Sequence, residues 1–172
     1  METNEILGTN QKGEIRLKSS TMMKEYYRAD SSQDFDEEGF LKTGDIGYYD
    51  EDECLYVVDR LKEMFKYLSW HIVPTAIENV LFEHPGVKEA IVFGLPKNEE
   101  EGEVPTASVV LEDGCRVTEK EIEEFVAGKV SDKEKLRGGV YFVKSIPRTP
   151  TGKVMRKKIR DDLIQSLEIN KS

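Results

Sequence analysis

The order of helical and extended patterns after Pro74 narrows the fold of this chain more than any other feature of its sequence. Residues after Pro74 have the apolar spacing of a helix, and Pro85-Gly86 would end that helix. Two apolar runs follow, VKEAIVFGL and TASVVLE, and such runs between Gly and Pro are typical of strands. We expect the first strand to end at Pro96 and the acidic stretch PKNEEEGEVP to form a solvated loop.

Two signals for helix starts come next along the chain. Thr118 precedes Glu121 by three residues, and Ser131 precedes Glu134 in the same way, which is the spacing of a capping box. The run GGVYFV then predicts another strand, and apolar residues at intervals of four from Met155 predict a final helix. The order of helix, strand, strand, helix, strand and helix predicts an α+β fold in which helices pack on a short sheet.

The residues before this region indicate strands and turns. GEIRL is typical of a short strand, and IGYYDEDECLYVVD has two apolar runs around an acidic turn, which predicts a hairpin. The next segment, RLKEMFKYLSWHIV, combines helical spacing with residues that favour strands, and we expect a second hairpin that turns at Leu68-Ser69. We place a short hinge between Asp59 and Lys62, with a β-rich domain at residues 1–60 and an α+β domain at residues 61–172.

Positive charge is concentrated in one part of an acidic chain. The net charge is −9, yet residues 133–160 contain ten Lys or Arg residues and a single acidic residue, Glu134. A sequence pI near 4.9 argues against general binding to nucleic acid. A local cationic patch is suited to a small polyanion such as a nucleotide, or to an acidic face of a partner.

Cysteine usage and apolar runs argue against several other classes. Cys54 and Cys115 are far apart and occur in no CxxC or Cys/His cluster, so we expect two reduced thiols and no metal site. No apolar run approaches the roughly 18 to 20 residues that a bilayer span needs, and the first residues lack the pattern of a secretory signal. We expect a cytoplasmic or peroxisomal protein, although the chain ends in Lys171-Ser172 and not in the peroxisomal signal Ser-Lys-Leu.

The loop before the final helix carries the strongest candidate for a ligand site. In TPTGK, Gly152 allows the backbone to approach a ligand closely, while Thr149 and Thr151 offer hydroxyl groups. Lys153 is expected at the start of a helix, where backbone N–H groups and the macrodipole favour anions. The loop is not a Walker motif, because an earlier glycine is missing and Val154 follows the lysine. Taken alone, the pattern also fits a capped turn with a solvated lysine.

Two earlier stretches supply further polar candidates. KTGDIGYYDEDE places Asp45 after a glycine turn at the head of a strand, where its carboxylate could accept two hydrogen bonds from a ribose diol. DRLKEMFK brings Arg60, Lys62 and Lys66 together near the expected domain boundary. Taken singly, the first stretch also fits an ordinary turn and the second a solvated basic turn.

In their order along the chain, these stretches resemble the C-terminal part of the adenylate-forming superfamily. The resemblance runs from about Leu7 to about Ile164 and rests on GFLKTGDIGYYDEDECLYVVDRLKEMFKYLSWHIVPTAIENVL and, much later, GGVYFVKSIPRTPTGKVMRKKIRDDL. The superfamily includes acyl-CoA synthetases, plant coumarate-CoA ligases, beetle luciferases and peptide-synthetase adenylation domains. The segment KEIEEFVAGKVSDKEKLRGGVYFV is most similar to the luciferase and coumarate-CoA ligase branch.

The resemblance implies an enzyme that joins a carboxylic acid to ATP and, in most members, then transfers the acyl group to CoA. Asp45 would bind the ribose hydroxyls of ATP, and Arg60 would be a second nucleotide contact. Lys62 would be the hinge residue of a mobile C-terminal lid. Lys153 would act in adenylation, and Lys66 would act in the second half-reaction, either thioester formation or luciferin oxidation.

The turn after Lys66 departs from the family pattern. The family usually has a lysine and a glycine after the tyrosine, at the channel for the pantetheine arm of CoA, whereas this chain has Leu68 and Ser69. A side chain at Ser69 could therefore narrow the CoA channel, which Trp70 would also line, and this makes CoA use a weaker implication than adenylation. His71 stands where many relatives have glutamine, and it fits a partly buried structural residue at least as well as a functional one.

The resemblance also implies which parts of the site the chain lacks. The family's large N-terminal domain carries the phosphate loop, the adenine and acid pockets and the glutamate that holds Mg²⁺. We expect this N-terminal catalytic domain of the same enzyme to be the partner of the chain, with a small carboxylic acid as substrate. We expect no adenylation by these 172 residues alone. The alternative is a non-catalytic module that binds a nucleotide or a partner.

Overall fold

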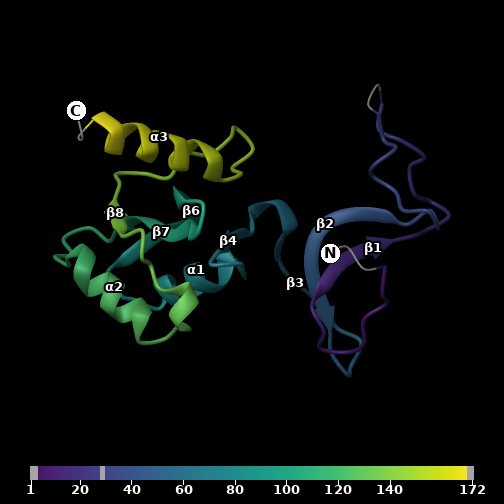
Figure 1. Cartoon of the computed structure of the whole chain (residues 1–172), viewed down its shortest axis with the longest axis horizontal. Helices are drawn as coiled ribbons and strands as arrows, with labels where there is room; N and C mark the ends of the chain where they lie inside the picture. The colour runs from purple at the N-terminus through teal and green to yellow at the C-terminus, as the bar shows by residue number, and fades with distance from the viewer. Residues whose placement is uncertain (1–3, 28–29, 170–172) are drawn as a thin grey trace. The chain divides into compact units, whose positions relative to one another are not determined.

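The chain separates into two compact units. A computed structural model describes residues 4–27 and 30–169, and the chain divides into Met1–Lys62, here unit 1, and Glu63–Ser172, here unit 2 (Figure 1). A short 3-10 helix, η1 (Leu61–Glu63), covers the point where the chain passes from one unit to the other. Among the helices of the described residues, none is both long enough and apolar enough to cross a bilayer.

Unit 1 contains an antiparallel sheet whose strands, in spatial order, are β1 (Gly13–Leu17), β2 (Leu41–Tyr49) and β3 (Leu55–Arg60). The predicted strand and hairpin are confirmed. Asp50 stabilises the acidic turn, because its Oδ1 atom accepts hydrogen bonds from the N–H groups of Cys54 and Asp52 at 2.9 and 3.0 Å. These bonds, the one from Cys54 above all, hold the pKa of Asp50 below its usual value.

Unit 2 has the predicted α+β architecture. Its sheet has the spatial order β5-β4-β7-β6, and β8 pairs in parallel with β7. The strands are β4 (Phe65–Tyr67), β5 (Trp70–Ile72), β6 (Val87–Asn98), β7 (Gly102–Leu111) and β8 (Val140–Phe142). The helices are α1 (Pro74–Phe82), α2 (Glu119–Ala127), the 3-10 turn η2 (Asp132–Glu134) and α3 (Arg156–Ile169).

Helices cover both faces of this sheet. In Figure 1, α1 and α2 lie on one face and α3 on the other. Alternate residues of β6 serve the two faces, since Val92 belongs to the apolar cluster of α1 and α2, whereas Ile91 and Phe93 belong to the cluster of Ile159 in α3. A strand buried on both faces needs a continuous apolar run, which explains the sequence AIVF.

The strand β6 is longer than the sequence predicts. It continues through Pro96, which pairs with Glu103 of β7, so that only Glu99 to Glu101 connect the two strands. The prediction of a strand end at Pro96 and of a loop over PKNEEEGEVP is therefore wrong. Since β6 lies at the edge of the sheet, it tolerates a residue that cannot donate a ladder hydrogen bond.

The two predicted capping boxes have different outcomes. The N–H of Glu121 donates to Oγ1 of Thr118 at 3.3 Å, and the Glu121 carboxylate accepts from the N–H of Thr118 at 2.7 Å, which begins α2 as predicted. The carboxylate of Glu134 also accepts from the N–H and hydroxyl of Ser131, at 3.1 and 2.6 Å. That second box caps only a single 3-10 turn.

Candidate functional site

The loop before α3 is a tight turn that ends at Lys153. The N–H of Gly152 donates to the carbonyl of Thr149 at 2.9 Å, and the N–H of Thr149 donates to the carbonyl of Lys153 at 2.8 Å. Gly152 has a φ of +85°, a conformation in which other residues are strained by about 1–2 kcal/mol. Pro150 has the fixed φ that suits the second position of the turn. The sequence TPTG therefore matches a three-residue hairpin turn with a glycine bulge.

The position of Lys153 relative to α3 differs from the prediction. The helix begins at Arg156, so Lys153 lies before the helix and not at its start. Val154 forms an isolated β-bridge with Arg148, which keeps the chain extended after the turn. This pairing delays the start of the helix.

The threonine hydroxyls are partly used within the turn. Oγ1 of Thr149 and Oγ1 of Thr151 are 2.9 Å apart, and Oγ1 of Thr149 also accepts from the N–H of Lys153 at 3.1 Å. The turn is thus stabilised by its own side chains. The side chain of Lys153 is exposed and forms no hydrogen bond or ion pair within residues 4–27 and 30–169. Its ammonium group is available to an anion.

Most of the nearby positive charge is already neutralised. Of the ten basic residues between 133 and 160, six form ion pairs with carboxylates in the part of the chain that the structure describes. The cationic patch is therefore smaller than the sequence suggests. Lys153 is one of the basic side chains whose charge is not offset by an ion pair within the described residues. The six paired residues are Lys135, Arg137, Arg148, Arg156, Lys158 and Arg160.

Two arginines attach the Lys153 turn to the rest of unit 2. On its N-terminal side, Nη2 of Arg148 is 2.6 Å from Oε2 of Glu89 on β6, and Nη1 of Arg148 donates to the carbonyl of Gly152 at 3.2 Å. On its C-terminal side, Nε of Arg156 is 2.7 Å from Oε2 of Glu63 on η1. The turn is therefore attached on both sides.

The attachment through Arg156 also completes the edge of the sheet. Nη1 of Arg156 donates to the carboxylate of Glu78 on α1 and to the carbonyl of Val92, and Oε1 of Glu78 accepts from the N–H of Val92 at 2.7 Å. Because β6 is an edge strand, these side chains satisfy backbone groups that no neighbouring strand reaches. Burial lowers the pKa of Arg156, but the carboxylates of Glu78 and Glu63 outweigh it and raise the pKa overall.

The structure joins two of the predicted nucleotide contacts in unit 1. Asp45 and Arg60 are opposite one another on β2 and β3, and Nε of Arg60 is 2.7 Å from Oδ1 of Asp45. Asp45 lies within β2, after Gly44 with a φ of +69°, and not at the head of the strand as predicted. The other carboxylate oxygen, Oδ2, has no hydrogen bond to any residue that the structure describes, so it is open to a ligand.

Lys66 lies on the predicted second hairpin, which is confirmed. It is opposite His71, and Tyr67 is opposite Trp70. Leu68-Ser69 forms the turn with φ values of +46° and +65°. Two successive positive φ values define a type I′ turn, in which Asn-Gly is favoured and larger residues are strained.

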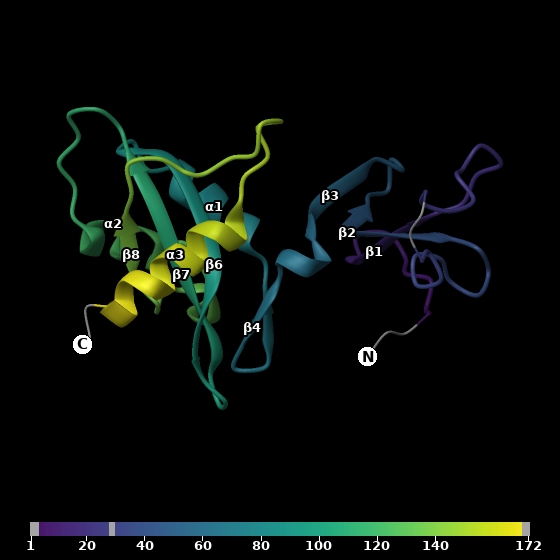
Figure 2. The same cartoon turned by 90° about the horizontal axis from the view of Figure 1, so that it is seen from above.

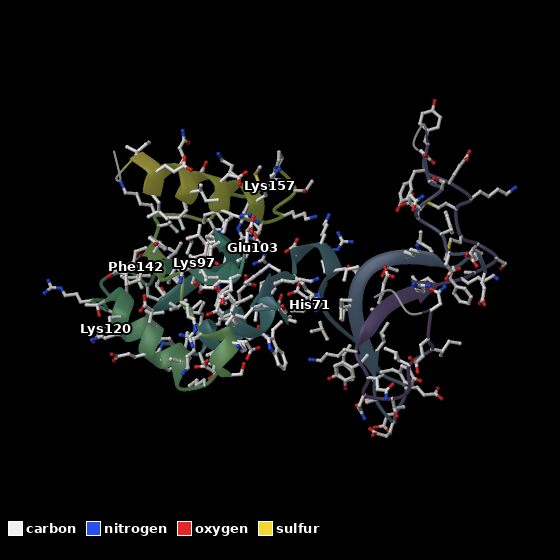
Figure 3. All side chains as sticks on the ribbon, viewed as in Figure 1. His71, Lys97, Glu103, Lys120, Phe142 and Lys157 are labelled. Atoms are coloured by element: carbon white, nitrogen blue, oxygen red, sulfur yellow. The ribbon has the colours of Figure 1, made fainter. Side chains whose placement is uncertain are left out.

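Four side chains around this turn are exposed. Trp70 is 62% exposed, and the side chains of Lys66 and Ser69 also face solvent in unit 2. His71 is exposed as well (Figure 3), so the interpretation as a partly buried structural histidine is wrong. All four side chains are therefore accessible to a ligand.

Gly102 fixes the hairpin of Lys66 against β7. It is opposite Tyr67 and has a φ of +74°. A Cβ atom at this position would lie 2.7 Å from the carbonyl oxygen of Lys66. Only glycine allows this approach of the two backbones without a shift of β4.

The two lysines predicted to be catalytic lie on different elements of unit 2. Lys66 is on β4 and Lys153 is in the loop before α3, and these segments are apart in both views of the fold (Figures 1 and 2). Lys62, the predicted hinge residue, is exposed on η1. Within the described parts of the chain, no group of three or more His, Cys, Asp or Glu side chains could hold a metal ion.

Sequence reasoning missed the carboxylates that orient the Lys153 turn. Glu63 and Arg156 are 93 residues apart, and no local pattern connects them. Glu78 did leave a signal, because it falls on the buried stripe of α1 together with Ile77 and Leu81. An acidic residue on a buried stripe predicts a cationic partner, because a buried carboxylate is seldom left unpaired.

One protein-family model matches the chain, namely the AMP-binding enzyme C-terminal domain, over residues 76–153. The chain is 42% identical to luciferin 4-monooxygenase of Photinus pyralis, over 100% of this chain and 32% of that protein. It is 43% identical to 4-coumarate–CoA ligase 3 of Arabidopsis thaliana, over 95% of this chain and 29% of that protein. The chain thus spans about a third of the length of the curated relatives that it matches.

Solved structures of related enzymes are also similar to this chain. ATP-bound MatB of Rhodopseudomonas palustris has a TM-score of 0.87 at 29% identity, covering 94% of this chain and 32% of that one. The amide bond synthetase McbA of Marinactinospora thermotolerans has a TM-score of 0.81 at 33% identity, covering 92% of this chain and 32% of that one.

Proposed function

Because this chain belongs to the C-terminal part of the adenylate-forming enzymes, we propose that it acts within an enzyme that joins a carboxylic acid to ATP. Residues 1–60 would be the β-rich end of a larger catalytic domain, and residues 61–172 would be its mobile lid with Lys62 as the hinge. The compactness of Glu63–Ser172 supports a lid that moves as one body. The acid would be a small carboxylic acid bound by the larger domain.

The observation that carries this proposal is the available ammonium group of Lys153 on a turn held from both sides. A carboxylate and a triphosphate repel one another, and charge develops further as the carboxylate attacks the α-phosphorus. A positioned cation offsets that charge, and its position costs no reorganisation during the reaction. Lys153 would therefore act in adenylation.

Asp45 and Arg60 would bind the nucleotide. The ion pair with Arg60 fixes the Asp45 carboxylate and leaves Oδ2 open in the described structure. Such a fixed acceptor suits the hydroxyl groups of a ribose. Arg60 is itself half-exposed and would supply the second contact to ATP.

Lys66 would act in the second half-reaction, on a different element from Lys153. An exposed lysine on each of two separate elements suits a lid that presents two faces in turn. The reaction would be acyl transfer to CoA, as the name of the coumarate–CoA ligase relative suggests, or an oxidation as in the luciferase relatives. Ser69 and Trp70, at the tip of the hairpin, would line the CoA channel if there is one.

ATP would be the first substrate, and Mg²⁺ and CoA are further proposals. Within residues 4–27 and 30–169 no cluster of ligands for a metal ion occurs, so these residues do not fit a magnesium site. Mg²⁺ would be bound mainly by the larger N-terminal domain.

The test is Lys153→Ala in the complete enzyme, measured by ATP–pyrophosphate exchange with a panel of carboxylic acids. We expect the rate to fall by at least about 100-fold, because removing one charge-stabilising group costs on the order of 3–4 kcal/mol. Lys157→Ala is the matched control, since Lys157 is also exposed and without an ion pair in the described chain (Figure 3). Equal rates for the two variants would contradict the proposal.

A binding module without chemistry predicts a different result. In that case, Lys153→Ala would weaken the binding of a nucleotide or partner, and no exchange would be detected in the complete protein with any acid. Exchange activity of the isolated 172 residues would also contradict the proposal, because a lid cannot adenylate alone.

A further inference from the structure

The connection between the Lys153 turn and α3 is short and well held. The N–H of Met155 donates to the carbonyl of Pro147 at 2.9 Å, and Val154 packs against the apolar cluster of Ile159. Only two residues, Val154 and Met155, lie between Lys153 and Arg156, so the backbone position of Arg156 limits where the turn can lie. The contacts that fix Arg156 therefore also fix Val154 and Met155, here called the base of the turn.

Arg156 is held at two edges of its guanidinium group by different elements. Nη1 contacts Glu78 and the carbonyl of Val92, while Nε contacts Glu63 at 2.7 Å. A planar guanidinium that is bonded along two edges cannot rotate about its stem, whereas a single contact would leave it free to swing. The second contact therefore adds orientation to the first.

The contact with Glu63 is not needed to complete the sheet. Glu78 already accepts from the N–H of Val92, and Arg156 already donates to the carbonyl of Val92. Glu63 binds only Nε of Arg156, and it directly follows Lys62 on η1. Its carboxylate joins η1 to the base of the turn that carries Lys153.

We propose that Arg156 is a positioning residue for adenylation, and that its ion pair with Glu63 holds the Lys153 turn to the segment that follows the hinge. This proposal rests on the proposed role of Lys153. In this role Arg156 would act through Lys153 and not through its own contact with the substrate. The hairpin of Lys66 has its own backbone pairing with β5 and β7, so the ion pair should matter for adenylation and not for the second half-reaction.

The test compares Glu63→Gln with Glu103→Gln. Both glutamates pair with an arginine of α3, at 2.7 Å for Arg156 and 2.9 Å for Arg160, and the glutamate side chains are 24% and 30% exposed. Glutamine keeps the shape and removes the charge. Only the first substitution acts on the base of the turn.

The first readout is amide hydrogen exchange in the 172-residue chain. In Glu63→Gln we expect the N–H groups of Gly152 and Met155, which are hydrogen-bonded within the loop, to exchange about tenfold faster. The N–H of Ala107 in the core, which donates to Gly139, should not change. Unchanged loop exchange, or an equal acceleration of the core, would overturn the proposal, because the second result indicates general destabilisation. Glu103→Gln should leave the loop unchanged.

The second readout is the pair of half-reactions in the complete enzyme. Glu63→Gln should slow adenylation by about 10-fold to 100-fold, the effect of a displaced catalytic group. It should leave the second half-reaction, started from a preformed acyl-adenylate, within about threefold. Arg156→Lys, which keeps the charge but not both edges, should also slow adenylation selectively. An equal loss in both half-reactions would overturn the positioning role.

Failure of this proposal can be told from failure of the proposed function. If Lys153→Ala abolishes adenylation while Glu63→Gln changes neither loop exchange nor rate, the positioning role alone is wrong. If Lys153→Ala leaves adenylation intact, the proposed function is wrong and the role in adenylation falls with it. Loop exchange then still reports whether the ion pair holds the turn.

Discussion

The two lysine-bearing segments of unit 2 are held in different ways. Main-chain contacts hold the Lys66 hairpin, because β4 pairs with both β5 and β7 and Gly102 lets the backbones approach closely. The Lys153 turn is attached mainly through the side chains of Arg148 and Arg156. Strand pairing depends on main-chain hydrogen bonds and on close packing of the backbones, whereas ion pairs depend on charge. The two segments should therefore respond to different perturbations.

Substitution of Arg156 should have the largest effect on the free energy of unfolding, and it acts on the attachment of the Lys153 turn. Arg156→Met leaves Glu63 and Glu78 without their cation. Breaking a buried ion pair in this way costs about 3–5 kcal/mol, and we expect about 3 kcal/mol because the side chains of Arg156 and Glu78 remain 18% and 12% exposed. Urea denaturation of unit 2 measures this loss.

Arg148→Met is the control for that experiment. The Arg148 side chain is 47% exposed and its partner Glu89 is 34% exposed, so its loss should cost less than about 1 kcal/mol. Equal losses for the two arginines would show that the buried attachment is no stronger than the exposed one.

A methyl group at Gly102 should disturb the Lys66 side. Gly102→Ala combines a positive φ with a Cβ at 2.7 Å from the Lys66 carbonyl, and we expect a loss of about 2–3 kcal/mol. Gly114→Ala is the matched control, because Gly114 has a φ of +78° and open space around it, and should cost about 1 kcal/mol. Equal losses in thermal or urea unfolding would mean that the close approach to Lys66 is not a constraint.

Ser69→Gly should stabilise the chain, in contrast to the variants above. Glycine relieves a residue at a φ of +65°, and the gain of about 0.5–1 kcal/mol remains after its greater flexibility in the unfolded chain is counted. Ser145→Gly, at an exposed serine without a positive φ, should instead destabilise by roughly 0.5 kcal/mol. If the melting temperature falls with both variants, the turn at Ser69 is not strained.

Salt should have the smallest effect, and its influence on amide exchange should differ between the two segments. Raising NaCl from about 0.05 M to about 1 M screens exposed ion pairs, so the N–H of Gly152 should exchange about twofold to threefold faster. The N–H of Leu68, which donates to the carbonyl of Glu101 at 2.9 Å, should exchange at an unchanged rate. An equal change in the exchange rates of both amides would contradict the claim that the two segments are held in different ways.

Local patterns were sufficient for much of the fold. The capping box of Thr118 and Glu121 and the hairpin at Leu68-Ser69 depend on a few neighbouring residues, so the sequence could predict both. The strand β6 passes Pro96 because its edge position tolerates proline, and that position depends on the whole sheet. Predictions were correct where the deciding interactions were local.

The candidate site shows the same limit. The sequence indicated the turn of Lys153 because Pro150 and Gly152 have fixed conformational preferences. It placed α3 too early, since the bridge between Val154 and Arg148 keeps the chain extended beyond the turn. The roles of the predicted site residues, and of Lys62 as a hinge, stay predictions.

The neutralisation of the basic segment has a consequence for how a nucleotide would be captured. The net charge is −9, and among the described residues six of the ten basic side chains between 133 and 160 are paired, so this chain should repel a polyphosphate at long range. Electrostatic steering of ATP would then have to come from other surfaces. Lys153 would contribute little to the rate of encounter and would act only after docking, at contact distance.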